Sequence, residues 1–303
     1  MWNGVSRRVF RTDTGRLRLG WRLLAFFAVA ACVTVATGFL LPPSVIAGSG
    51  ALLMGGLVAG WMLLGIDGRP PAALGFHLDG KAAPALAIGT GVGTLIALGA
   101  VGLLALVGGV AWTAESGTVL GWLAAGSSAL LFLALPAAAE EVLLRGYLLQ
   151  ALGEAWGTGR ALFLTSVLFA VAHLGNPGIT ALAVLNIAAA GLWLGVIWVR
   201  TGSLWWATGA HLGWNWGGAY VADLPVSGLE LFDAPFYEAS TGGPDWLGGG
   251  PFGPEGSVLA TLVLGGATWW CWRTPRLRAN ETVEAAGPLV AIGRMERETK
   301  ESD

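Results

Sequence analysis

The chain has 303 residues, of which 54% are hydrophobic and only 12% are charged. Soluble domains carry about 25% charged residues, so half of the expected charge is missing. The net charge of −2 gives no reason to expect a nucleic-acid partner, and two cysteines in distant apolar runs predict neither a disulfide framework nor a cysteine-rich metal site. The composition therefore predicts an integral membrane protein.

Eight apolar runs, separated by polar or turn-rich segments, are candidate transmembrane helices. A helix needs about 20 apolar residues to cross the hydrocarbon layer of a bilayer. In chain order the runs lie near residues 22–41, 45–66, 83–109, 119–150, 161–175, 178–199, 203–221 and 256–272. Pro136 predicts a kink in the long fourth run. We therefore expect an all-α polytopic membrane protein with about eight transmembrane helices.

Basic residues indicate the orientation, because cytoplasmic loops are enriched in Lys and Arg. Six arginines lie before or at the first residue of the first run, and with eight spans all 17 Lys and Arg lie on the same side. The acidic loop 222–255 has no basic residue and is expected to face out. The sequence thus predicts a multi-pass protein of the cell (plasma) membrane with both termini in the cytoplasm. It would consist of a basic N-terminus (1–21), one transmembrane domain (22–278) and a disordered tail (279–303).

Ionisable side chains inside membrane spans are costly, and they are functional candidates by default. In this chain they are Glu140, Glu141 and Arg145 in the fourth run, His173 in the fifth, and His211 in the seventh, with Asn215 one turn later. Counted from the cytoplasmic ends at about 1.5 Å per residue, Glu140, His173 and His211 lie roughly 16, 20 and 16 Å into the membrane. Three helices therefore bring carboxylates and imidazoles to similar depths, which favours a common site.

Spacing along the helices divides these side chains into pairs. Glu141 and Arg145 are four residues apart, so they share a helical face and can form an ion pair. Glu140 is rotated by about 100° and is free to point elsewhere. His211 and Asn215 project together for the same reason. Taken singly, each feature has a simpler explanation, such as a packing ion pair, a histidine bonded to a carbonyl, or an asparagine that links helices.

Three glycines also stand out in the third run. Gly89, Gly91 and Gly93 alternate with other residues in the middle of an apolar segment, and no strand precedes them. A phosphate-binding loop requires that strand, so the pattern favours close helix packing through small residues.

Three motifs on successive runs resemble those of a known family. Residues 140–145 (EEVLLR) are similar to its Glu-Glu-x-x-x-Arg motif, residues 169–173 (FAVAH) to its Phe-x-x-x-His motif, and residues 211–215 (HLGWN) to its His-x-x-x-Asn motif. The family is the CPBP group, which comprises CAAX proteases and bacteriocin-processing enzymes and is also called Abi or type II CAAX prenyl endopeptidases. Each motif alone is short, but the three in this order are specific. The resemblance covers about residues 120–220.

The resemblance implies an eight-helix intramembrane endopeptidase with its site open to the cytoplasmic leaflet. By this carry-over Glu140 and His173 activate a water molecule, while His211 and Asn215 bind the oxyanion. Glu141 and Arg145 support these catalytic groups. The implied partners are membrane lipid and a protein or peptide substrate, which is prenylated in eukaryotic members of the family. The sequence itself identifies neither the substrate nor a lipid on it.

Two other functions and one cofactor stay open. A non-catalytic immunity or scaffold protein of the same fold would use the same helices without hydrolysis. An ion or proton pathway is less favoured, because its polar groups would be strung along the membrane normal. Glu140, His173 and His211 could bind Zn²⁺ with one open position, or Glu140 and His173 could hold the water alone.

Overall fold

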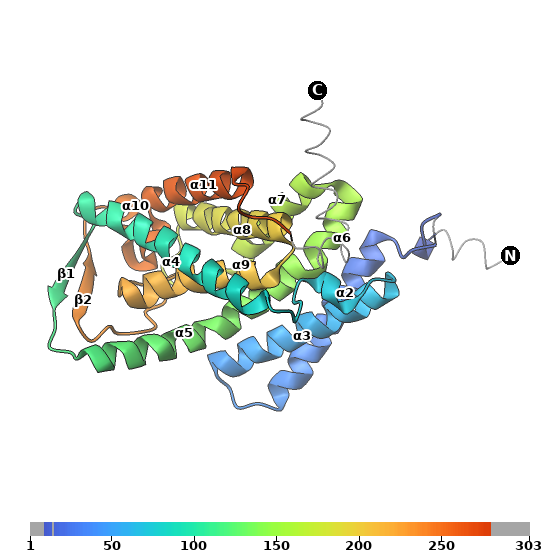
Figure 1. The fold of residues 1–303 in the computed structure, drawn as a ribbon, viewed down its shortest axis with the longest axis horizontal. Coiled ribbons are helices and arrows are strands. Elements are labelled where there is room, and N and C mark those ends of the chain that lie inside the picture. Colours follow the sequence, from blue (N-terminus) through green and yellow to red (C-terminus); the bar gives the residue numbers. More distant parts are fainter. Residues whose placement is uncertain (1–8, 14, 280–303) are drawn as a thin grey trace, which may run out of the picture.

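The computed structural model describes residues 9–13 and 15–279, and most of this part of the chain is helical (Figure 1). The main helices are α2 (Leu19–Phe39), α3 (Val45–Ile66), α4 (Ala82–Leu106), α5 (Val119–Glu141), α6 (Tyr147–Trp156), α7 (Thr158–Ala172), α8 (Ala181–Thr201), α9 (Leu204–Trp216) and α11 (Val258–Arg273). Each apolar run identified in the sequence thus corresponds to one of these helices or to a continuous series of them. The tail from residue 280 onward, which was expected to be disordered, lies outside the described residues.

The lengths of these helices fit a membrane protein. Within the described residues, five helical segments are long and apolar enough to cross a bilayer: α2, α3, α4, α8 and the continuous helix Val119–Trp156. α7 is a shorter apolar helix, and α9 and α11 have 13 and 16 residues. The chain is therefore a helical membrane protein, and the number of eight spans remains a prediction.

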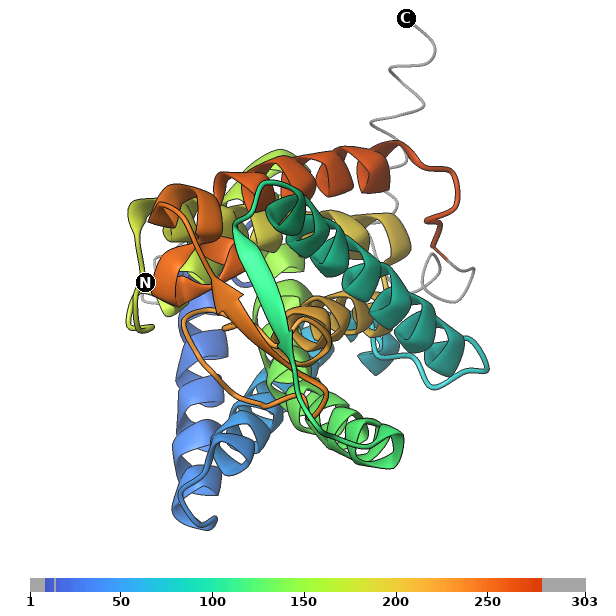
Figure 2. The ribbon, with the colours of Figure 1, turned by 90° about the vertical axis from the view of Figure 1, so that its left-hand side faces the viewer.

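Two short strands correct the prediction of an all-α fold. β1 (Val110–Ala114) pairs antiparallel with β2 (Tyr237–Thr241). They lie side by side at one end of the bundle, which we call the strand end (Figures 1 and 2). The backbone groups of loop segments need hydrogen-bond partners, and pairing provides them here. The Asp223 carboxylate also accepts bonds from the backbone N–H groups of Ala234 and Ala239, at 2.9 and 3.0 Å.

Glycines bring α4 and α9 into close contact. A methyl group added at Gly93 of α4 would overlap the carbonyl of Ala210 in α9, and Gly89 also faces the α9 backbone. The Thr94 hydroxyl donates to the Gly213 carbonyl at 3.1 Å. The predicted close packing is confirmed for these two glycines, whereas the middle glycine of the run faces open space. Because little side-chain material separates the two backbones, α4 restricts the position of α9.

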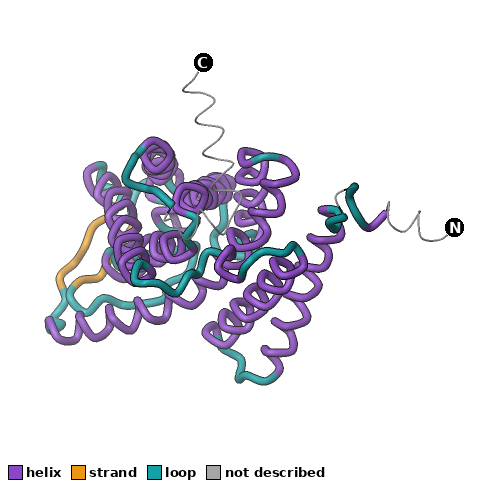
Figure 3. Tube along the Cα trace, turned by 45° about the vertical axis from the view of Figure 1, so that its right-hand side comes forward, coloured by secondary structure: helices purple, strands orange, loops and turns teal. Residues whose placement is uncertain are grey.

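Buried charges join α2, α3 and α6 at the opposite end of the bundle. Arg22 contacts the carboxylates of Asp67 at 2.6 Å and Glu154 at 3.1 Å, and its Nε donates to the Tyr147 hydroxyl at 2.7 Å. The Tyr147 hydroxyl in turn donates to Asp67 at 2.8 Å. We call Arg22, Asp67, Tyr147 and Glu154 the arginine cluster. The antiparallel pair α2 and α3, which leans away from the other helices in Figure 3, is fastened to the bundle by this cluster.

Candidate active site

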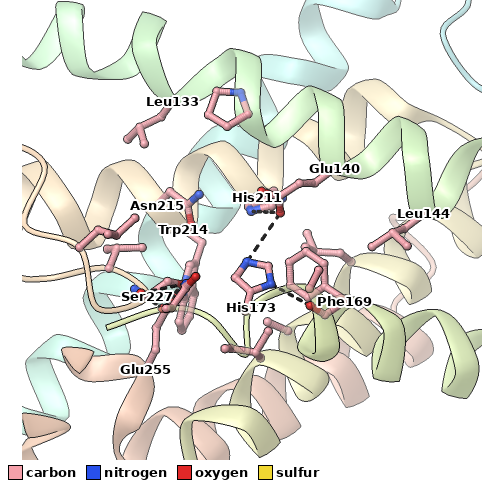
Figure 4. A pocket seen from close by; sticks show the side chains of 18 of the residues that line it. Leu133, Glu140, Leu144, Phe169, His173, His211, Trp214, Asn215, Ser227 and Glu255 are labelled. Atoms are coloured by element: carbon pink, nitrogen blue, oxygen red, sulfur yellow. Dashed lines mark hydrogen bonds and ion pairs between the residues drawn. The ribbon is translucent and has the colours of Figure 1, made fainter. Parts of the chain in front are cut away.

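A cavity of about 440 Å³ lies among α3, α5, α7, α8 and α9. This volume falls within the range of about 300–1,000 Å³ typical of ligand sites. Its lining includes Glu140, His173, His211 and Asn215, the four side chains predicted to be catalytic (Figure 4). The other lining residues are largely apolar and come from several helices. The cavity therefore combines an apolar wall with a small set of polar groups.

Glu140 lies between the two histidines (Figure 4). Its Oε2 atom is 3.9 Å from Nε2 of His173 and 3.9 Å from Nε2 of His211. This oxygen is buried and has no hydrogen-bond partner among the described residues. One water molecule at an ordinary hydrogen-bond distance of about 2.8 Å can reach two groups that are about 4 Å apart. The geometry therefore allows a water molecule to bridge the Glu140 carboxylate and an imidazole.

The Phe-x-x-x-His spacing explains how His173 is oriented. His173 caps the C-terminal end of α7, and its Nδ1 atom lies 2.7 Å from the Phe169 carbonyl one turn earlier. A carbonyl only accepts hydrogen bonds, so Nδ1 carries the proton and Nε2 faces Glu140. The rings of Phe169 and His173 are also in contact, with centroids 4.7 Å apart. The backbone and ring of Phe169 thus hold the imidazole in one orientation.

Glu141 and Arg145 orient the other histidine. Oε1 of Glu141 accepts hydrogen bonds from His211 Nδ1 and from Arg145 Nη1, each at 3.0 Å. The side chains of Glu141 and Arg145 are completely buried. Arg145 also donates to the Gly191 carbonyl at 2.9 Å and lies 4.7 Å above the Phe169 ring. The predicted Glu141–Arg145 pair is confirmed, and its contact with His211 leaves Nε2 of that histidine free to face the cavity.

The helix that carries these acidic residues changes its geometry immediately after them. α5 stays helical through Pro136, where the sequence predicted a kink, and ends at Glu141. A π-helical segment, η2 (Val142–Gly146), then connects it to α6 and contains Arg145. Single π-helical turns are rare and occur frequently at functional sites. The irregularity nearest to the acidic pair is therefore this turn.

Asn215 lies in the cavity wall beyond His211 (Figure 4). It follows His211 by one helical turn, but none of the hydrogen bonds of the described residues joins it to Glu140 or to either histidine. Trp214 also lines the cavity. Trp216 does not, because its ring stacks on Tyr220 and its Nε1 donates to the Gly126 carbonyl at 2.9 Å. Of the two tryptophans next to the motif, one is thus part of the site.

Residues 122–217 match the family model of the Rce1-like type II CAAX prenyl endopeptidases. This central segment, which we call the CAAX-protease segment, is therefore similar to the CAAX-protease family. This CAAX-protease segment contains both acidic residues, Arg145, both cavity histidines and Asn215, and the family indicates a protease. Searches of curated proteins and of solved structures found no match.

Two further polar side chains line the cavity from outside the CAAX-protease segment. Ser227 and Glu255 belong to the loop between α9 and α11, and both reach the cavity at the side of Trp214 (Figure 4). In the sequence this loop is acidic and rich in glycine and proline, and these features indicate an exposed connection. No pattern within the loop distinguishes Glu255 from the other acidic residues of the loop, most of which are exposed.

The predicted zinc ligands of the CAAX-protease segment are Glu140, His173 and His211. In the described part of the chain, no group of three His, Cys, Asp or Glu side chains has the arrangement needed to hold a metal ion. His173 and His211 each use Nδ1 to bond a protein group and direct only Nε2 toward Glu140. The predicted zinc ligands thus come together, but their present spacing does not fit a metal ion.

Proposed function

We propose that this protein is an intramembrane endopeptidase that hydrolyses a peptide bond with a water molecule activated by Glu140. The observation that carries the proposal is the equal distance of 3.9 Å from Glu140 Oε2 to the Nε2 atoms of His173 and His211. The match of residues 122–217 to a protease family supports the same function. We assign the reaction to Glu140, His173, His211 and Asn215, which line one cavity.

The first step removes a proton from water and forms a carbon–oxygen bond. Glu140 accepts the proton, and the water oxygen attacks the carbonyl carbon of the scissile peptide bond. The neutral His173 accepts a hydrogen bond at Nε2 from the O–H that the water keeps, because its Nδ1 proton is donated to the Phe169 carbonyl. These two groups thereby set the direction of attack.

The second step breaks the carbon–nitrogen bond. His211 and Asn215 donate hydrogen bonds to the oxyanion, and each good donor contributes about 3–4 kcal/mol. His211 already uses Nδ1 for Glu141, so it donates from Nε2 only as an imidazolium, which the Glu141 carboxylate stabilises. The proton held by Glu140 then passes through His173 to the leaving amine. The products are a carboxylic acid and an amine.

The proposed topology has eight spans, including the shorter helices α7, α9 and α11. A short span is accommodated by local thinning of the bilayer at modest cost. We propose that the protein lies in the plasma membrane. We place the arginine cluster and both termini on the cytoplasmic side and the strand end outside, because basic residues concentrate at the end of the bundle that carries the arginine cluster. Residues 22–278 then form one transmembrane domain.

The cavity wall suggests the kind of substrate. Beyond the polar groups the lining continues along α3 and α5 as an apolar surface that includes Val45, Leu52, Leu133 and Pro136. Such a wall suits an apolar or lipidated segment of a protein or peptide that enters from the membrane. We therefore propose membrane lipid and such a peptide as partners.

Replacing Glu140 by Gln tests the proposal, because the amide cannot accept the proton from water. We would measure cleavage of a farnesylated peptide with a CAAX-type C-terminus by purified protein in nanodiscs. Peptide termini in the membrane proteomes of wild-type and Glu140→Gln cells would be compared in parallel. Glu238→Gln, which changes an exposed carboxylate on β2, is the matched control. Wild-type cleavage by a folded Glu140→Gln protein would refute the assignment.

A further inference from the structure

Glu255 is a buried carboxylate in the wall of the catalytic cavity. It lies in the short turn Pro254–Gly256 before α11, and its residue exposure is only 9%. An ionised carboxylate in such a place is costly unless hydrogen-bond donors surround it. The residue lies outside the segment that matches the CAAX-protease family. Its role must therefore be inferred from its own contacts.

Three donors from two other segments satisfy the Glu255 carboxylate. The indole Nε1 of Trp214 donates to Oε1 at 2.6 Å. The backbone N–H and the hydroxyl of Ser227 donate to Oε2 at 2.6 and 2.7 Å. The backbone carbonyl of Glu255 accepts a further bond from Asn186 of α8 at 2.7 Å. Bonds to a charged acceptor are about twice as strong as neutral ones, so the Glu255 carboxylate holds α9 and the segment that contains Ser227 firmly together.

Ser227 stands in a turn whose backbone needs this support. Ser227 has φ of +53° and Gly228 has φ of +78°, so both central residues of the turn are left-handed. A non-glycine residue in this region is strained and persists only where its surroundings hold it. Glu255 supplies that constraint through two bonds. The turn also packs against the end of α7, because Asn176 Nδ2 donates to the Ser227 carbonyl at 3.0 Å and Gly228 lies against the Pro177 carbonyl.

These contacts connect the two helix ends that carry the proposed catalytic groups. Asn176 follows His173 by three residues, and Trp214 directly precedes Asn215. We propose that Glu255 is a positioning residue of the peptidase: through Trp214 and the Ser227 turn it sets the separation between His173 and Asn215. This inference rests on the proposed function, because the separation must match one peptide bond.

The experiment distinguishes positioning from simple stabilisation. In nanodiscs we would measure kcat and KM on the farnesylated CAAX-type peptide for wild type, Glu255→Gln and Trp214→Phe, with Glu238→Gln as control. For a folded Glu255→Gln protein we expect kcat to fall about 10- to 100-fold with KM changed by about twofold or less, because small misplacements of catalytic groups act on the transition state. In the double variant Glu255→Gln/Trp214→Phe, kcat should fall by less than the product of the two single fold-losses, since both substitutions act on the same hydrogen bond between Trp214 and Glu255.

Each contrary result points to a different error. A folded Glu255→Gln protein with wild-type kcat, alongside an inactive Glu140→Gln protein, would overturn the positioning role and leave the proposed function intact. A fall in kcat that only matches the loss of folded protein would show that Glu255 stabilises without positioning. If wild type has no turnover that depends on Glu140, the proposed function fails and the inference with it. If Glu255→Gln does not fold, Ser227→Ala, which removes one of the three donors, is judged by the same criterion.

Discussion

Replacing Glu141 by Gln removes the charge on which two buried side chains depend. One oxygen of Glu141 accepts hydrogen bonds from Arg145 and His211, each at 3.0 Å, and the side chains of Glu141 and Arg145 are fully buried. The substitution keeps the size of the side chain and an acceptor oxygen. Arg145 would then retain, among the contacts described for it, the Gly191 carbonyl and the face of the Phe169 ring. A buried guanidinium would be left without its counter-charge.

The expected loss of stability is large. Removing one partner of a buried ion pair costs about 3–5 kcal/mol, because the remaining charge stays buried. In proteins of roughly 150–250 residues each kcal/mol lowers the Tm by about 2–4 °C, so the fall should be roughly 6–20 °C. The double variant Glu141→Gln/Arg145→Met removes the stranded cation as well. It should therefore recover part of the stability lost by Glu141→Gln alone.

Thermal unfolding in nanodiscs, followed by tryptophan fluorescence, measures both effects. Glu115→Gln serves as the control, because Glu115 is exposed beside β1. Peptidase activity should also fall in Glu141→Gln, since His211 loses the anion that stabilises its imidazolium. A Glu141→Gln protein with the wild-type Tm would refute the dependence of Arg145 on this carboxylate. A double variant that is no more stable than Glu141→Gln would do the same.

Three further predictions concern the packing, the arginine cluster and metal content. Gly93→Leu should lower the Tm by an amount equivalent to about 1–3 kcal/mol or more, because the side chain would overlap the Ala210 carbonyl; Gly91→Leu, which faces open space, should not. Tyr147→Phe removes a hydroxyl that bonds Arg22 and a carboxylate, so unfolding measurements should show a loss of about 1.5–3 kcal/mol. Mass spectrometry of the active purified protein should find less than one zinc per chain, because no three donor side chains in the described residues have metal-binding spacing; stoichiometric zinc whose removal abolishes activity would contradict this.

Much of the helical framework could be predicted, because hydrophobicity in a membrane protein is organised along the chain. Long apolar runs have to form helices, and their polar breaks set the helix ends. The similar depths of Glu140, His173 and His211 were predicted from residue counts alone, and the structure places Nε2 of each histidine 3.9 Å from Glu140 Oε2. It succeeded because a straight helix converts sequence separation directly into distance along its axis.

Contacts between distant segments could not be predicted in this way. The partner of Glu141 on α9 and the bonds of Glu255 depend on how helices and loops meet. Composition even pointed in the wrong direction for Glu255, since four of the five other acidic residues of its loop are exposed. Composition was also misleading for Arg22. The sequence groups it with the basic residues of the N-terminal segment, but in the structure it is buried in the arginine cluster.

The proposed catalytic residues and the residues that position them lie in different parts of the chain. The motif residues of the CAAX-protease segment are the proposed reactive groups. Two of them, His211 and Asn215, lie on α9, which is short and ends at Trp216. Its position is restricted from outside that segment, by the glycine face of α4 around Gly93 and by Glu255 through Trp214. A catalytic group that is misplaced by about 1 Å can lose 100-fold in rate. The flanking helix and loop should therefore control how fast the motif residues act, even though they contribute no reactive group themselves.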